Sequence, residues 1–112
     1  KAKIKQKQRA MITQGMMNAV GDATVVITNP THIAVAIKYE DGQNNAPKLV
    51  AKGIDHLAIR IKEKAKENDV PIIENKPLAR MIYKEVELDR EIPQEMYQAV
   101  AEILVAIYKM KK

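Results

Sequence analysis

Two runs of β-branched residues, separated by an Asn-Pro turn, constrain this chain more than any other feature. Residues 24–28 read Thr-Val-Val-Ile-Thr, and residues 33–39 read Ile-Ala-Val-Ala-Ile-Lys-Tyr. In the second run, alternate residues from Ile33 to Tyr39 share one face of an extended chain. Turn-forming residues fill positions 29–32 between the runs. The pattern predicts two buried strands joined by a tight connection, so the fold is expected to be built around a sheet.

The rest of the chain alternates between helical and extended patterns. A helix is expected over residues 4–18, ending near Gly21, and short strands over 48–51 and 70–73. Residues 54–68 place Ile54, Leu57, Ala58, Ile61 and Ala65 on one face of a helix.

Two further helices complete the predicted order. One begins at Pro77 with Leu78, Met81 and Ile82 facing inward, and the last opens at Pro93. The last helix has a continuous apolar stripe made of Met96, Ala99, Val100, Ile103, Leu104 and Ile107. The resulting order is α, β, β, β, α, β, α, α. It predicts an α/β fold in which a small four-stranded sheet is surrounded by helices, with an N-terminal linker helix.

Length and composition exclude several classes of protein. A chain of 112 residues supports one hydrophobic core. The sequence has no Cys and no Ser, which excludes disulfide scaffolds and Ser or Cys nucleophiles. Its two histidines, His32 and His56, make a zinc site improbable, and we expect neither a metal nor a cofactor. No apolar run has the length of a membrane span.

The net charge of +5 comes from the first ten residues. Five bases stand there without an acid: Lys1, Lys3, Lys5, Lys7 and Arg9. Such an arm is typical of a solvated helical linker, or of a segment that docks on anionic lipid or nucleic acid. The sequence has no Phe or Trp, and none of its four Tyr lies in the arm, which argues against single-strand nucleic-acid binding. We expect no nucleic-acid partner, and read residues 1–20 as the linker and 21–112 as the globular domain.

Asn29-Pro30 is the one chemically unusual dipeptide. Most Asn-Pro pairs simply start turns, and that explanation stays open here. Pro30 has no backbone N–H, however, so it cannot attack the Asn29 side chain as an ordinary following residue does. The Asn29 side-chain nitrogen can instead attack its own backbone carbonyl. That reaction forms a succinimide, expels Pro30 as a secondary amine and cuts the chain between them.

Neighbouring groups could accelerate such a cut. The two reacting groups belong to one residue, which gives a high effective molarity when they are well oriented. His32 is the nearest titrating side chain and would act as base or acid, while Thr31 could orient it or stabilise the turn. The plainer alternatives are a surface imidazole for His32 and a turn hydroxyl for Thr31. A turnover hydrolase is disfavoured, because no paired carboxylates occur on the predicted loops.

The segment from Val25 to Ala36, with Asn-Pro-Thr-His at its centre, resembles the self-cleaving motif of type III secretion export-switch proteins, the FlhB/YscU family. The resemblance continues through Ala46-Pro47, Val50-Ala51-Lys52-Gly53, Leu57-Ala58 and Val70-Pro71-Ile72, and then through Pro77-Leu78-Ala79-Arg80, Ile92-Pro93 and Ala99-Val100-Ala101-Glu102. The block around Lys52 and the ending Lys38-Tyr39 favour the flagellar branch over the injectisome branch, which remains the alternative.

The resemblance implies a function as well as a fold. It implies a cytoplasmic domain joined to an N-terminal membrane part, at the cytoplasmic face of the bacterial inner membrane. It implies one self-cleavage, between Asn29 and Pro30, by a protein that is not a turnover enzyme. Cleavage would permit the change from rod and hook substrates to filament substrates. The implied partners are export-gate membrane proteins, a hook- or needle-length ruler protein, the export ATPase complex and the exported substrates.

A surface for substrates or partners could be a polar patch of Lys38, Lys52, Arg80 and Glu85, with Leu78 and Ala79 forming a small exposed apolar dimple. The chain could also be a membrane- or nucleic-acid-docking module that binds through its basic arm, in which Asn-Pro is only a turn.

Overall fold

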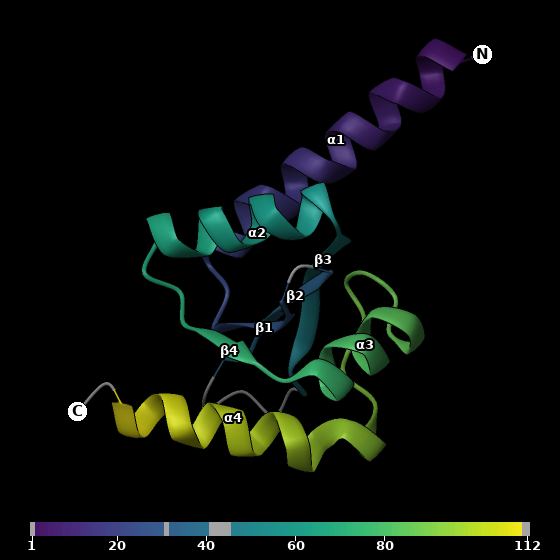
Figure 1. Cartoon of the computed structure of the whole chain (residues 1–112). Helices are drawn as coiled ribbons and strands as arrows, with labels where there is room; N and C mark the ends of the chain where they lie inside the picture. The colour runs from purple at the N-terminus through teal and green to yellow at the C-terminus, as the bar shows by residue number, and fades with distance from the viewer. Residues whose placement is uncertain (1, 31, 41–45, 111–112) are drawn as a thin grey trace.

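The two predicted strands lie at the centre of a four-stranded sheet in a computed structural model of the chain (Figure 1). The structure describes residues 2–30, 32–40 and 46–110, with side chains described from Ile12 to Lys109 within those ranges. The strands are β1 (Val25–Asn29), β2 (Ile33–Lys38), β3 (Lys48–Ile54) and β4 (Ile72–Glu74). Their order is β3-β2-β1-β4. The β1·β2 and β2·β3 pairs are antiparallel, and β4 is parallel to β1.

Helices cover both faces of this sheet. They are α1 (Ala2–Gly21), α2 (His56–Glu67), α3 (Lys76–Glu85) and α4 (Tyr97–Met110), which a short 3-10 turn, η1 (Gln94–Met96), precedes. Figure 1 shows α1 and α2 on one face, α3 and α4 on the other, and the first half of α1 extending away from the body. The predicted α/β fold with an N-terminal helix is confirmed. No described helix combines the length and hydropathy that a membrane span requires.

The strand β1 is buried on both faces, which explains why its first three residues, Val25, Val26 and Ile27, are all apolar. Val25 and Ile27 pack with α3 and α4, while Val26 packs with α1 and α2, and none of the three side chains is exposed. The end of α1 belongs to the second cluster, because Met16, Met17 and Val20 are buried in it. The predicted linker helix therefore contributes core residues to the body; the division of the chain at residue 20 stays a prediction.

Two predicted core positions are wrong. Ile54 was expected to open the apolar face of a helix, but it ends β3 and is 46% exposed. The chain stays extended there because the β2·β3 pairing continues to Ile33 and Ile54, which delays α2 to His56. Met81 was expected to face inward and is 45% exposed. The buried face of α3 instead contains Leu78, Ala79 and Ile82.

Candidate self-cleavage site

The Asn-Pro dipeptide lies in the tight turn that joins the two central strands. Asn29 is the last residue of β1 and pairs with Ile33, the first residue of β2. The His32 backbone N–H donates to the Asn29 carbonyl oxygen at 3.0 Å. This hydrogen bond closes a four-residue β-turn with Pro30 in its second position, where the fixed φ of proline is favoured. Thr31, the third residue of the turn, lies outside the described residues.

The site is buried on the strand side and open on the turn side. Thr28 is 3% exposed and Asn29 is 7% exposed, and they are the polar residues that the described core contains. His32 is exposed. The peptide bond that follows Asn29 is thus at the boundary between the packed sheet and solvent. Its Asn29 side retains little contact with bulk water, while the imidazole of His32 belongs to an exposed residue.

The Asn29 carbonyl accepts a hydrogen bond in this geometry. When an amide nitrogen attacks a carbonyl carbon, negative charge develops on the carbonyl oxygen, and a fixed donor at 2.7–3.1 Å stabilises it. The His32 N–H lies 3.0 Å from the Asn29 oxygen in the ground state, so it points at the atom on which this charge would develop. The structure therefore identifies the His32 backbone N–H as a donor to this oxygen, a group that the sequence does not single out. Backbone donors leave no residue-type signature, so no sequence feature points to this one.

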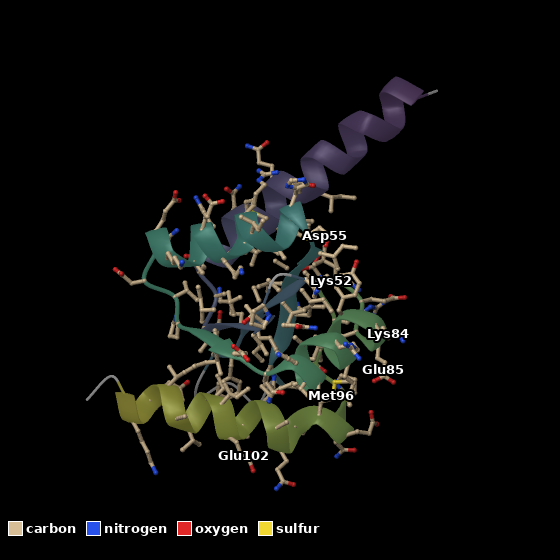
Figure 2. The ribbon with its side chains drawn as sticks, viewed as in Figure 1. Lys52, Asp55, Lys84, Glu85, Met96 and Glu102 are labelled. Carbon is tan, nitrogen blue, oxygen red and sulfur yellow. The ribbon has the colours of Figure 1, made fainter. Side chains whose placement is uncertain are left out.

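Two more backbone hydrogen bonds hold the residues on either side of the turn. The Asn75 N–H donates to the Thr28 carbonyl at 2.9 Å, and the Asp55 N–H donates to the His32 carbonyl at 3.0 Å. Asn75 is the N-cap residue of α3, and Asp55 is the N-cap residue of α2. Asp55 has φ 53° and ψ −118°, a conformation that residues other than glycine rarely adopt. Figure 2 shows Asp55 at the corner where the chain enters α2.

Two of the residues predicted to form a partner surface are buried. Leu78 is 5% exposed and Ala79 is fully buried, so the expectation of an exposed apolar dimple is wrong. The reason is that α3 turns these side chains into the core cluster beneath the sheet. Arg80 is exposed on α3, and Lys38 forms an exposed ion pair with Glu40 at 3.4 Å.

Lys52 has a structural contact of its own. Its Nζ donates to the Tyr83 carbonyl at 3.0 Å and to the Val86 carbonyl at 2.9 Å, and it lies 5.1 Å from the centre of the Tyr83 ring. Its ammonium thus satisfies carbonyls at the end of α3, where the helix dipole favours a cation. Figure 2 shows Lys52 on the sheet, pointing toward α3.

A pocket in the described part of the chain lies at the end of the β2·β3 ladder that is opposite to the turn. It has a volume of about 340 Å³ and is lined by Lys38, Glu40, Ala46, Lys48 and Glu91. Lys38 and Lys48 pair at one end of the β2·β3 ladder, while Ile33 and Ile54 pair at the other, next to the turn. Among the residues that the structure describes, no cluster of His, Asp or Glu is suited to hold a metal ion.

Comparison with known proteins places these features in one family. The profile of the FlhB HrpN YscU SpaS Family matches residues 1–107. The flagellar biosynthetic protein FlhB of Bacillus subtilis is 52% identical over 112 residues, which are all of this chain and 31% of that protein. The FlhB of Salmonella typhimurium is 45% identical over the same 112 residues, 29% of its length. This chain therefore spans about a third of the length of these relatives.

Solved structures agree with the sequence relatives. The crystal structure of the cytoplasmic domain of FlhB from Shewanella putrefaciens matches with a TM-score of 0.83 and 38% identity, covering 88% of this chain and 76% of that one. A mutated EscU C-terminal domain matches with a TM-score of 0.78 and 32% identity, covering 82% of this chain and 92% of that one. Profile, sequence and fold agree over nearly the whole length, and the chain belongs to the FlhB HrpN YscU SpaS family.

Proposed function

We propose that this chain is the self-cleaving switch domain of a flagellar type III export apparatus and that it cuts itself once, between Asn29 and Pro30. The observation that supports this most directly is the turn at the end of β1. There, the carbonyl that would be attacked accepts a hydrogen bond from the His32 N–H at 3.0 Å, and the leaving residue is a proline. The reaction happens once per molecule and regenerates nothing, so the domain is not a turnover enzyme.

The chemistry of the proposed cut balances without an external reagent. The Asn29 Nδ2 attacks the Asn29 backbone carbonyl carbon, and a five-membered ring forms. The tetrahedral intermediate collapses by breaking the bond to the Pro30 nitrogen. Nδ2 loses a proton, and the Pro30 nitrogen gains one. The products are a C-terminal succinimide at residue 29, which water later opens, and a secondary amine at residue 30.

His32 contributes to this reaction in two separable ways. Its backbone N–H stabilises the developing oxyanion, an effect that is worth about 2.7–4 kcal/mol at well-placed sites. Its imidazole would move the proton from Nδ2 to the Pro30 nitrogen, a role that typically accelerates a reaction by roughly 10²–10⁴-fold. Thr31 is proposed to support the turn.

The two products are expected to stay together. The cut would break the peptide bond after β1 but leave β1 paired with its neighbouring strands in the sheet. The first product would contain α1 and β1, and β1 lies between β2 and β4 in the sheet. Val25, Val26 and Ile27 have no exposed surface. Each such burial contributes about 1.5–3 kcal/mol, so non-covalent packing is expected to hold the fragment in place.

The proposed consequence of cleavage is a change in the surface that export substrates meet. A free Pro30 end would let the segment before β2 take a new direction, and the apparatus would change from rod and hook substrates to filament substrates. The partners would be the export-gate membrane proteins, a length-sensing ruler protein, the export ATPase complex and the substrates themselves, at the cytoplasmic face of the inner membrane. The 45–52% identity to flagellar relatives supports the flagellar branch, against 32% to the EscU domain.

Mass spectrometry under denaturing conditions tests the proposal. The unaltered chain is expected to give two fragments that meet at residues 29 and 30, and the Asn29→Ala chain one species of about the full 12.6 kDa. Asn18→Ala, which alters an exposed asparagine of α1, is the matched control and should cleave like the unaltered chain. An unaltered chain that folds and stays whole during long incubation at neutral pH would refute self-cleavage.

A further inference from the structure

The turn around the proposed cut is held at both ends by residues that begin helices. Thr28, just before Asn29, has its carbonyl bonded by Asn75 at the start of α3. His32, at the end of the turn, has its carbonyl bonded by Asp55 at the start of α2. Each of these bonds extends a strand ladder by one residue at the point where the chain leaves the sheet. Asn75 follows β4 and Asp55 follows β3, so the turn is held from the strands on its two sides.

The Asp55 anchor is made at a conformational cost. Its φ of 53° with ψ of −118° is a backbone conformation that costs a non-glycine residue stability, and its side chain makes no capping hydrogen bond that offsets the cost. Gly53, two residues before Asp55, is buried and packs closely on Leu57, which fixes how the chain turns from β3 into α2. The corner is therefore held by its surroundings in a geometry that points the Asp55 N–H at the His32 carbonyl.

We propose that Asp55 and Asn75 are positioning residues for self-cleavage, whose backbone N–H groups clamp the two limbs of the turn so that the His32 N–H stays on the Asn29 carbonyl. The His32 N–H and the His32 carbonyl belong to one residue, so anchoring the carbonyl limits how far the N–H can move from the Asn29 oxygen. Anchoring the Thr28 carbonyl limits the movement of the next residue, Asn29, whose carbonyl oxygen accepts the hydrogen bond. A loose turn would lose the near-attack arrangement on which an intramolecular reaction depends.

The test removes one N–H at a time. Full-length chains are synthesised with an ester in place of the amide at Asp55 or at Asn75, and are refolded from denaturant to start the reaction. Each ester has a matched control one helical turn later. An ester at Ile59 removes its 3.1 Å bond to the Asp55 carbonyl, and an ester at Ala79 removes its 2.9 Å bond to the Asn75 carbonyl. The controls lose a hydrogen bond at the same corners without touching the turn.

If Asp55 and Asn75 clamp the turn, only the esters at these two residues should slow cleavage. The esters at Asp55 and Asn75 should each slow cleavage by about tenfold, the effect of one lost hydrogen bond on a rate, whereas the controls should change it by less than about twofold. The same four esters are also made in Asn29→Ala chains. Thermal unfolding of these chains checks that each test ester lowers stability about as much as its control ester does. Equal rates in all four esters, with the unmodified chain cleaving, would overturn the clamp and leave the proposed function intact. This inference rests on that function, and an unmodified chain that does not cleave would instead refute the function itself.

Hydrogen exchange gives a second measurement that needs no ester. In the uncleavable Asn29→Ala chain, the amides of Asp55 and Asn75 should exchange as slowly as those in the middle of β2, because each is held in a hydrogen bond at the sheet edge. Exchange at the rate of an open loop at either position would contradict the clamp even if an ester chain failed to fold.

Discussion

His32 is proposed to assist cleavage through both its backbone N–H and its imidazole, and the two effects can be separated experimentally. A change to alanine removes the imidazole but keeps the backbone N–H that bonds the Asn29 carbonyl at 3.0 Å. We therefore expect His32→Ala to slow cleavage by roughly 10²-fold, the lower end of general acid–base effects, without abolishing it. The rates of His32→Ala and of the unaltered chain are compared by mass spectrometry of the fragments over time. An unchanged rate would remove the imidazole from the mechanism and leave the turn as the main contributor.

Lys52 is expected to matter for stability and not for chemistry. Replacing it by methionine keeps the aliphatic stem but leaves the Tyr83 and Val86 carbonyls without their ammonium donor. We expect Lys52→Met to lower the free energy of unfolding by about 2 kcal/mol, measured by urea denaturation in the Asn29→Ala chain. Lys38→Met is the control, since its exposed pair with Glu40 should be worth less than about 1 kcal/mol. Equal losses for the two substitutions would show that the contacts at the end of α3 contribute little.

At the scale of elements, replacing two glycines by alanine is expected to change stability in opposite directions. A Cβ on Gly53 of β3 would lie 2.6 Å from the Leu57 Cγ, so Gly53→Ala must push α2 away from the sheet. We expect it to lower the free energy of unfolding by about 1–3 kcal/mol. A Cβ on Gly15 of α1 would meet nothing within 4 Å, so Gly15→Ala should raise stability by roughly 0.5–1 kcal/mol through helix propensity. Urea denaturation of both variants tests this, and a Gly53→Ala chain as stable as its parent would contradict the close packing of α2 on β3.

The elements were predictable where local pattern decides them. The β-branched runs specified β1 and β2, and the stripe after Pro93 specified α4, because burial on one or both faces leaves a period in the sequence. Ile54 and Met81 were misplaced because pairing across the sheet and the orientation of α3 are decided by distant residues. Asn29 and His32 stood out by their chemistry, whereas the donors from Asp55 and Asn75 come from the backbone and have no sequence signature.

At the scale of the whole molecule, cleavage should convert one chain into a tightly held pair. The cleaved protein is expected to elute as a single species in gel filtration, because β1 remains between β2 and β4. Its unfolding midpoint should rise with protein concentration, since unfolding now releases two fragments. The midpoint of the Asn29→Ala chain should not depend on concentration. Elution of the fragments as separate species under native conditions would contradict this account of the sheet.

The central claim is that Asn29 itself provides the nucleophile. The most direct measurement follows a synthetic full-length chain after refolding, with no other protein present, by mass spectrometry of both fragments over time. The account predicts a first-order rate that is independent of protein concentration, a second fragment that begins at Pro30, and a first fragment that is initially one water lighter than its free acid because it ends in a succinimide. A chain that stays intact, or a first fragment that ends in a free carboxylate from the earliest time point with oxygen taken from labelled water, would contradict it.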